Sequence, residues 1–227
     1  MNKVKSLTEA VQHVKTGMTV MVGGFGLIGA PLSLIETLTD HDVTNLTIIS
    51  NNLGEAGKGL GALLRQGKIK SAIGSYFTSN REVGEKFHAG EIEITLLPQG
   101  TFSESIRAGG AGIGGYYTKT GVNTEIAVGK EVREINGELY CFEKALSADV
   151  ALVRAHKADR LGNLTYYKTA RNFNPMMATA ASLVIAEVDE IVENGTLNPE
   201  EIVTPHLYVD ALVLSNKVLT KEGVVSR

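Results

Sequence analysis

A run of four apolar or β-branched residues, Thr19–Val22, leads directly into the glycine-rich segment Gly23–Ala30, which is followed by Pro31. A strand this short and apolar is typical of strands buried on both faces of a parallel sheet. Proline suits the first turn of a helix because its φ is fixed and no N–H is left unpaired, so we expect a helix over Pro31–Leu38. This order of strand, turn and helix predicts an α/β fold.

Strands and helices continue to alternate as far as residue 107. A capping box, Ser6–Glu9, marks the start of a first helix that should end near Val14. The other predicted strands of this half are Leu46–Ser50, Ser71–Ile73 and Ile92–Leu97, and the other predicted helices are Leu60–Arg65, Glu82–His88 and Phe102–Arg107. Strands that alternate with helices pair in parallel through helical crossovers, so a parallel sheet is expected.

The pattern changes in the second half of the chain. Asn136-Gly137 separates two runs of alternating apolar and polar residues, which predicts a β-hairpin. Further strands are expected at Val150–Arg154 and Leu183–Val188, closing the sheet with a mixed or antiparallel edge. Because no linker or repeat divides the chain, we predict one α/β domain over residues 1–227. It should be an open, largely parallel sheet flanked by helices, with an added antiparallel hairpin region in the C-terminal half.

Composition argues against several classes of function. The net charge of −3 gives no electrostatic footprint for nucleic acid or an anionic membrane surface. The apolar runs are no longer than strands, and the first residues lack the apolar segment of a signal peptide, so we expect a cytoplasmic protein without a membrane partner. The five histidines do not fall at metal-ligand spacing and Cys141 is the single cysteine, so no metal site is expected.

The glycine-rich segment is the first candidate binding site. Between a strand and a helix, several backbone N–H groups and the positive end of the helix can face a phosphate or another anion. The candidate residues are Gly23, Gly24, Phe25, Gly26, Leu27, Ile28 and Gly29. A tight strand-to-helix turn without a ligand is the alternative interpretation.

Gly24, Gly26 and Gly29 also match the G-x-G-x-x-G pattern of dinucleotide-binding proteins. That pattern needs an acidic residue at the end of the second strand, to hold the ribose hydroxyls. The second predicted strand ends instead in Ser50-Asn51-Asn52. An NAD(P)-dependent dehydrogenase is therefore the alternative, not the first choice.

The whole segment is more specific than its glycines, because Gly-Gly-Phe-x-x-x-Gly-x-Pro after an apolar strand resembles the signature of the family I coenzyme A transferases. Further stretches resemble, in order and spacing, the alpha subunit of the 3-oxoacid and acetate coenzyme A transferases. They are Ser50–Asn52, Leu97–Thr101, Ile106–Gly112, Tyr117–Gly121, Gly162–Tyr166, Ala170–Asn174 and Thr204-Pro205. The resemblance extends from about Thr19 to about Leu214.

This resemblance implies an enzyme that moves coenzyme A between an acyl-CoA and a short-chain carboxylate or 3-oxoacid. It also implies that the catalytic glutamate, which forms a glutamyl-CoA thioester, belongs to a separate beta subunit, in an assembly of two alpha and two beta chains. The CoA thioester would be a substrate, and no tightly bound cofactor is implied. A non-catalytic binding module on the same fold is a further alternative.

Amide side chains are the supporting catalytic candidates of this chain. Asn51, Asn52 and Gln99 each follow an apolar strand, where the binding residues of open α/β sheets collect. An uncharged amide can donate to a developing oxyanion, and the resemblance places these residues near the reacting acyl group. The simpler alternatives are a turn for the two asparagines and a helix-entry position for Gln99.

Two further groups of residues are candidates for contacts with a ligand. A predicted loop over Gly109, Gly110 and Gly112 could approach a ligand or the partner subunit, since glycine tolerates close backbone contact. Three cations could bind a carboxylate or phosphate. They are Arg107, Lys119 and Arg171. A ligand-free loop and solvated surface charges are the alternatives.

Glu193-Asn194-Gly195 matches part of the family's nucleophile motif. In that family the motif belongs to the beta subunit, with a serine before it and another glycine shortly after. Here Val192 precedes it and Thr196 follows. We therefore predict a surface turn at this position, and we expect the nucleophile in the partner chain.

Overall fold

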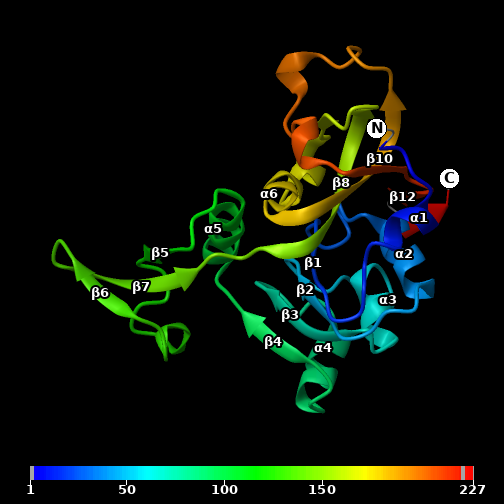
Figure 1. Cartoon of the computed structure of the whole chain (residues 1–227). Helices are drawn as coiled ribbons and strands as arrows, with labels where there is room; N and C mark the ends of the chain where they lie inside the picture. Colours follow the sequence, from blue (N-terminus) through cyan, green and yellow to red (C-terminus); the bar gives the residue numbers. More distant parts are fainter. Residues whose placement is uncertain (1–2, 221–222, 227) are drawn as a thin grey trace.

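The computed structural model describes residues 3–220 and 223–226. Within this part of the chain, eight strands form the central sheet in the order β11-β10-β8-β1-β2-β3-β4, with β9 paired to β8 (Figure 1). Their bounds are β1 Thr19–Val22, β2 Leu46–Ile49, β3 Ile69–Gly74, β4 Glu93–Leu96, β8 Ala148–Asp159, β9 Leu164–Thr165, β10 Ala181–Val192 and β11 Ala211–Leu214. Neighbours along the path pair in parallel and β9 pairs antiparallel. The predicted open, largely parallel sheet is confirmed.

The later strands differ from the prediction. The expected mixed or antiparallel closing edge is wrong, because β10 pairs in parallel with both β8 and β11. The segments between these strands, residues 160–180 and 193–210, are long enough for parallel crossovers. Much of each segment is irregular, so the sequence offers no clear helical period from which to infer the direction of the next strand.

β1 is the point from which the sheet grows in both directions. The chain adds β2, β3 and β4 on one side of β1 and later adds β8, β10 and β11 on the other. The strand order therefore reverses between β1 and β8. Ligands of open α/β sheets bind at such a switch point, outside the carboxyl ends of the strands.

Helices cover both faces of the sheet. Their bounds are α1 Leu7–Val11, α2 Leu32–Asp40, α3 Leu60–Arg65, α4 Arg81–His88, α5 Gln99–Gly110 and α6 Asn174–Thr179, with 3₁₀ helices at Glu125–Ala127, Lys168–Arg171, Pro199–Glu201 and His206–Tyr208. Val20 and Val22 of β1 pack in one apolar cluster with α1 to α4. Met21 points to the other face and packs in a second cluster with α5 and α6. β1 is thus buried on both faces, as its apolar sequence predicts.

An antiparallel arm extends from the central sheet (Figure 1). It consists of β5 (Gly115–Thr118), β6 (Val132–Ile135) and β7 (Glu138–Lys144), in the order β5-β7-β6. Asn136 and Gly137, between β6 and β7, have φ values of 54° and 78°, which a two-residue hairpin turn requires. The predicted hairpin is therefore confirmed. A second hairpin pairs β12 (Lys217–Thr220) with β13 (Gly223–Ser226).

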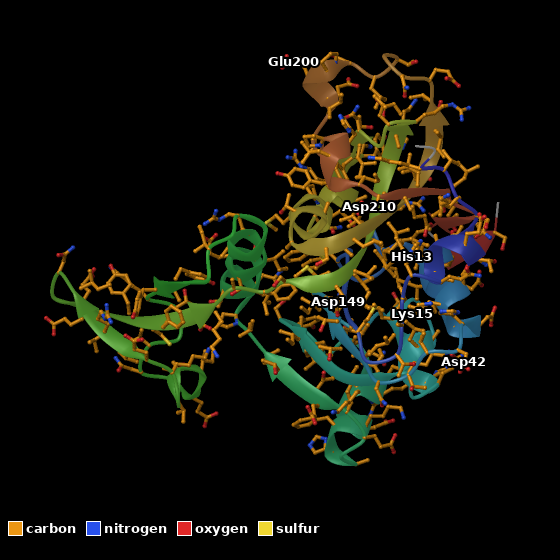
Figure 2. The ribbon with its side chains drawn as sticks, viewed as in Figure 1. His13, Lys15, Asp42, Asp149, Glu200 and Asp210 are labelled. Carbon is orange, nitrogen blue, oxygen red and sulfur yellow. The ribbon has the colours of Figure 1, made fainter. Side chains whose placement is uncertain are left out.

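Two aspartates at the amino ends of the strands accept hydrogen bonds from backbone N–H groups of neighbouring strands. Asp149 accepts a hydrogen bond from the N–H of Thr19 at 2.8 Å, and Asp210 accepts one from Val184 at 2.8 Å. Figure 2 labels both aspartates. These acids join neighbouring strands at the end of the sheet opposite to the switch point.

None of the helices in residues 3–220 and 223–226 is long and apolar enough to cross a membrane.

Candidate functional site

The glycine loop, residues 23–29, lies at the switch point. Gly23 donates its N–H to the carbonyl of Leu152 in β8, with an N···O distance of 3.0 Å. Phe25 and Ile28 exchange backbone hydrogen bonds of 2.9 and 3.2 Å, which close a tight turn. Their side chains are 53% and 47% exposed. The loop therefore has an apolar tip that the described part of the chain covers only in part.

Two asparagines near the start of α6 hold the glycine loop. Asn172 accepts a hydrogen bond from the N–H of Gly24 at 3.1 Å and donates to the carbonyl of Ile28 at 2.9 Å. Asn174 is fully buried and donates to the carbonyl of Gly29 at 3.0 Å. Its Oδ1 accepts the N–H of Arg154 in β8 at 2.8 Å. The 170–174 motif thus fixes the conformation of a loop far away in the sequence.

Close packing explains why glycine is required at two positions of this loop. A Cβ on Gly23 would lie 1.8 Å from Oδ1 of Asn174. A Cβ on Gly29, where φ is +70°, would lie 2.4 Å from the carbonyl oxygen of Ala170. Both contacts are with this chain and need no ligand to account for them.

Three backbone N–H groups of the loop have no acceptor in the described part of the chain. Within the described residues, the backbone N–H groups of Gly26, Leu27 and Gly29 donate to no protein acceptor, whereas those of Gly23, Gly24, Phe25 and Ile28 are paired. Unpaired amides at a strand-to-helix turn are typical of sites that bind anionic groups. If the loop binds an anion, these three N–H groups are its backbone donors.

A cluster of amides forms at the carboxyl ends of β2, β3 and β4. We call Asn51, Asn52, Ser75 and Gln99 the amide cluster. Nδ2 of Asn51 donates to Oγ of Ser75 at 2.8 Å and to Oε1 of Gln99 at 2.9 Å. Nδ2 of Asn52 donates to Oδ1 of Asn51 at 3.1 Å. The three residues chosen from the sequence therefore belong to one connected network, and Ser75 joins it without a sequence motif to indicate it.

Exposure separates the members of the amide cluster. Asn51 is 1% exposed and Asn52 is 5% exposed, whereas Gln99 is exposed at the first position of α5. Asn52 also lines a small cavity together with Gly23 and Gly26 of the glycine loop. The glycine loop and the amide cluster therefore lie along one edge of the sheet, and Gln99 is the member with a free approach from solvent.

A buried ion network supports the start of α2, directly after the glycine loop. Glu187 of β10 is fully buried, accepts the N–H of Leu34 at 3.0 Å and accepts the hydroxyl of Ser33 at 2.9 Å. Arg154 pairs with this carboxylate and with Asp189, the latter at 2.6 Å. The sequence did not indicate this network, because its members lie on separate elements and form no local motif.

The chain is similar to known proteins over most of its length. The sequence profile described as coenzyme A transferase matches residues 4–215. The chain belongs to the coenzyme A transferase family. One of the subunits of a succinyl-CoA:3-ketoacid coenzyme A transferase from Xanthomonas campestris is 52% identical over 89% of this chain and 84% of that protein. The alpha subunit of an acetate CoA-transferase from Escherichia coli K12 is 44% identical over 95% of this chain and 98% of that protein. The predicted resemblance is confirmed, and the dehydrogenase alternative is not favoured.

A solved structure has the same fold as this chain. An acyl-CoA transferase from E. coli O157:H7, solved as a thioester complex with CoA, superposes with a TM-score of 0.88 at 23% identity. The match covers all of this chain and 50% of that chain. The present chain therefore spans half the length of the solved chain, and the likeness concerns the fold alone.

Two of the glycines that the sequence predicted in a loop are helical. α5 extends to Gly110, so the expectation that Gly109 and Gly110 form a loop is wrong. A Cβ on Gly109 would lie 1.9 Å from the carbonyl oxygen of Leu146, and one on Gly110 would lie 2.1 Å from Oγ1 of Thr179. Gly112 follows the helix with φ of +71° and open space around it. Packing of α5 within this chain thus accounts for the first two glycines.

The three candidate cations predicted from the sequence all lie on the surface. Arg107 pairs with Glu104 one turn earlier in α5, and this hydrogen bond holds the pKa of Glu104 below its ordinary value. Lys119 pairs with Glu138 in the arm. Arg171 is exposed in the 3₁₀ helix Lys168–Arg171. Within residues 3–220 and 223–226, no group of three or more His, Cys, Asp or Glu could hold a metal ion.

Glu193 directly follows β10. Its side chain is 74% exposed and pairs with Nε of Arg160 at 2.8 Å. Its carbonyl accepts the N–H of Thr196 at 3.1 Å, and Gly195 has φ of +81°. This is the turn predicted from the sequence.

Proposed function

We propose that the chain transfers CoA between an acyl-CoA and a short-chain carboxylate or 3-oxoacid, together with a separate beta subunit that carries the catalytic glutamate. The observation that carries this proposal is the amide cluster beside the glycine loop. The two relatives described above are each named as one subunit of such an enzyme, and the match covers 84% and 98% of their lengths. The solved chain of twice the length supports a second half supplied by another polypeptide.

The proposed reaction is covalent catalysis in several steps. The partner's glutamate attacks the thioester carbonyl and expels CoA thiolate, which gives an acyl anhydride. The thiolate attacks the glutamyl carbonyl of the anhydride and releases the carboxylate product, which leaves an enzyme-CoA thioester. A second carboxylate then reverses these steps. Each step passes through a tetrahedral oxyanion that needs preorganised donors.

We assign the donor role in this chain to the carboxamide of Gln99. Its Oε1 already accepts a hydrogen bond from Asn51, which leaves the N–H groups of Nε2 for the reacting acyl oxygen. Asn51 and Asn52 support this role from buried positions. Gly112 keeps its proposed place in a loop near ligand or partner.

We assign binding of CoA to the glycine loop, Gly23 to Gly29. The N–H groups of Gly26, Leu27 and Gly29 are the proposed donors to a phosphate or another oxygen of CoA. Phe25 and Ile28 supply exposed apolar area beside these donors, suited to the aliphatic part of CoA or to the partner.

Several finer points belong to the same proposal. The acceptor acid lies among short-chain carboxylates and 3-oxoacids, since the relatives are named for acetate and for 3-ketoacids. We further propose a single domain over residues 1–227, an assembly of two alpha and two beta chains, a cytoplasmic location, and no tightly bound cofactor.

Reconstitution tests the proposal. The purified chain, the purified beta partner and their mixture are compared for exchange of CoA between succinyl-CoA or acetyl-CoA and acetoacetate, acetate or butyrate. Transfer is expected from the mixture and not from the chain alone. Transfer by the chain alone at rates near those of the mixture would show that the nucleophile is here.

A further inference from the structure

Ser75 sits between the buried and exposed parts of the amide cluster. It follows β3, is half-buried, and accepts a hydrogen bond from Nδ2 of Asn51 at 2.8 Å. Because its oxygen accepts from an N–H, its own proton is free to be donated, and it is donated to Oε1 of Gln99. We infer that Ser75 is a positioning residue, which with Asn51 fixes the carboxamide of Gln99 so that Nε2 faces outward.

Asn51 determines which end of the Gln99 carboxamide faces inward. Both hydrogens of its Nδ2 are used, one on Ser75 and one on Gln99, and its Oδ1 accepts from Asn52. A donor at this position requires an acceptor opposite it, so the oxygen of the Gln99 carboxamide faces inward. The flipped carboxamide would place N–H against N–H. Asn51 itself has no free hydrogen for a ligand, so its contribution passes through Gln99.

Ser75 adds the second point of attachment. The carbonyl of Asn51 accepts the backbone N–H groups of Ser75 at 3.2 Å and Tyr76 at 3.0 Å, which fixes the β3 turn against the end of β2. Gln99 is exposed and its side chain has three rotatable bonds, whose ordering opposes a fixed orientation of the carboxamide. With one hydrogen bond the carboxamide can still pivot, whereas two hydrogen bonds to one oxygen restrict its direction.

This inference rests on the proposed function, in which Nε2 of Gln99 is the oxyanion donor. The variant that tests it is Ser75→Ala in the complex with the beta partner, with Ser75→Thr as the conservative variant and Ser79→Ala, an exposed serine of the same loop, as the matched control. Ser75→Ala is expected to lower kcat by about 10- to 100-fold, the size expected for a displaced catalytic group. KM for acyl-CoA should change less than about threefold, and Ser75→Thr should recover most of the rate.

A measurement on Gln99 itself separates positioning from catalysis. The chain has three glutamines, and Gln12 and Gln66 are exposed. Labelling with [¹⁵N]glutamine therefore gives three side-chain amide signals, and Gln99→Ala identifies the signal of Gln99. In the parent its two protons should be well separated from those of Gln12 and Gln66. In Ser75→Ala the signal should move toward theirs, and in Ser79→Ala it should stay.

The outcomes are distinct. An unchanged Gln99 signal in Ser75→Ala overturns the inference, whatever happens to the rate. The inference is also overturned if Ser75→Ala moves the signal but leaves kcat unchanged while Gln99→Ala inactivates the enzyme. The orientation of Gln99 would then have no effect on the rate. If Gln99→Ala leaves transfer intact while Ser75→Ala still moves the signal, the proposed role of Gln99 fails and the fixed orientation stands.

Discussion

The carboxamide oxygen of Asn172 accepts the backbone N–H of Gly24 at 3.1 Å, across 148 positions of sequence. The same side chain donates to Ile28, so one residue ties the glycine loop near both ends. Asn172→Ala should therefore raise the Kd of the alpha–beta complex for CoA by about tenfold. It should also lower the free energy of unfolding by about 1–3 kcal/mol, because backbone groups lose their partners.

The backbone of Asn172 provides the control for that prediction. Its φ is +21°, a region that favours glycine. Asn172→Gly removes the side chain and adopts this φ without the strain that alanine meets there, so it should weaken CoA binding as much as Asn172→Ala. Isothermal titration with CoA compares the two. Parent-like affinity in the glycine variant would mean that the side chain does not shape the loop.

Gly29 and Gly26 form a matched pair in the same loop. Both have positive φ, +70° and +62°, but a Cβ on Gly29 would meet the carbonyl oxygen of Ala170 at 2.4 Å while one on Gly26 would meet nothing within 4 Å. Gly26→Ala should lower the free energy of unfolding by about 1 kcal/mol, from backbone strain alone. Gly29→Ala should lower the free energy of unfolding by about 1–3 kcal/mol more than Gly26→Ala does, because the surrounding chain must move. Chemical denaturation measures both, and equal losses would contradict the packing explanation.

Gln99→Ala should lower kcat by about 10²–10³ with little change in KM for acyl-CoA, as expected for loss of an oxyanion donor. Gln66→Ala, at an exposed helix end, serves as the control. Steady-state transfer by the assembled complex is the measurement. A Gln99→Ala enzyme within about threefold of the parent would remove Gln99 from the reaction.

Glu193→Gln should leave transfer nearly unchanged. A nucleophilic glutamate cannot be replaced by its amide, whereas an exposed side chain in a turn usually moves stability by no more than about 0.5 kcal/mol. Hydroxylamine or borohydride trapping after incubation with acyl-CoA, followed by mass mapping, should mark a glutamate of the beta chain. A mark on Glu193 together with an inactive Glu193→Gln enzyme would place the nucleophile in this chain.

Tyr166 predicts a dependence of stability on alkaline pH. Burial raises the pKa of its phenol to about 12, and the hydroxyl contacts Oγ1 of Thr204 at 2.7 Å. The unfolded chain has a tyrosine pKa of about 10. The protonated phenol thus stabilises the fold fully below pH about 10, and this contribution is lost as the pH rises towards about 12. The difference in unfolding free energy between parent and Tyr166→Phe should be constant below pH about 10 and shrink above it.

The local order of elements follows from the sequence because each signal is local. The apolar run Thr19–Val22 and the helix Leu60–Arg65 have the bounds expected, and Asn136-Gly137 forms the expected turn. The parallel edge made by β10 and β11 could not be expected in the same way. Strand direction depends on the path of the connecting chain, which here contains little regular structure.

In the candidate site too, local features could be predicted from the sequence and long-range contacts could not. The proximity of Asn51 and Gln99 could be predicted because polar residues after apolar strands collect at one edge of a parallel sheet. Ser75 occupies the equivalent place after β3, but a lone serine in a turn carries no signal of its own. Asn172 and Arg154 act through partners more than 30 positions away, which only the folded chain reveals.

The central place of β1 has a consequence for the chain as it leaves the ribosome. β2, β3 and β4 emerge soon after β1 and can pair in turn, yet the other edge of β1 must await β8, since Thr19 meets Asp149 across 130 positions. At typical elongation rates this interval is roughly 6–26 s. Throughout it, an apolar strand edge is open to other nascent chains. A chaperone that shields residues 19–22 during synthesis should therefore raise the yield of this protein more than one added after release.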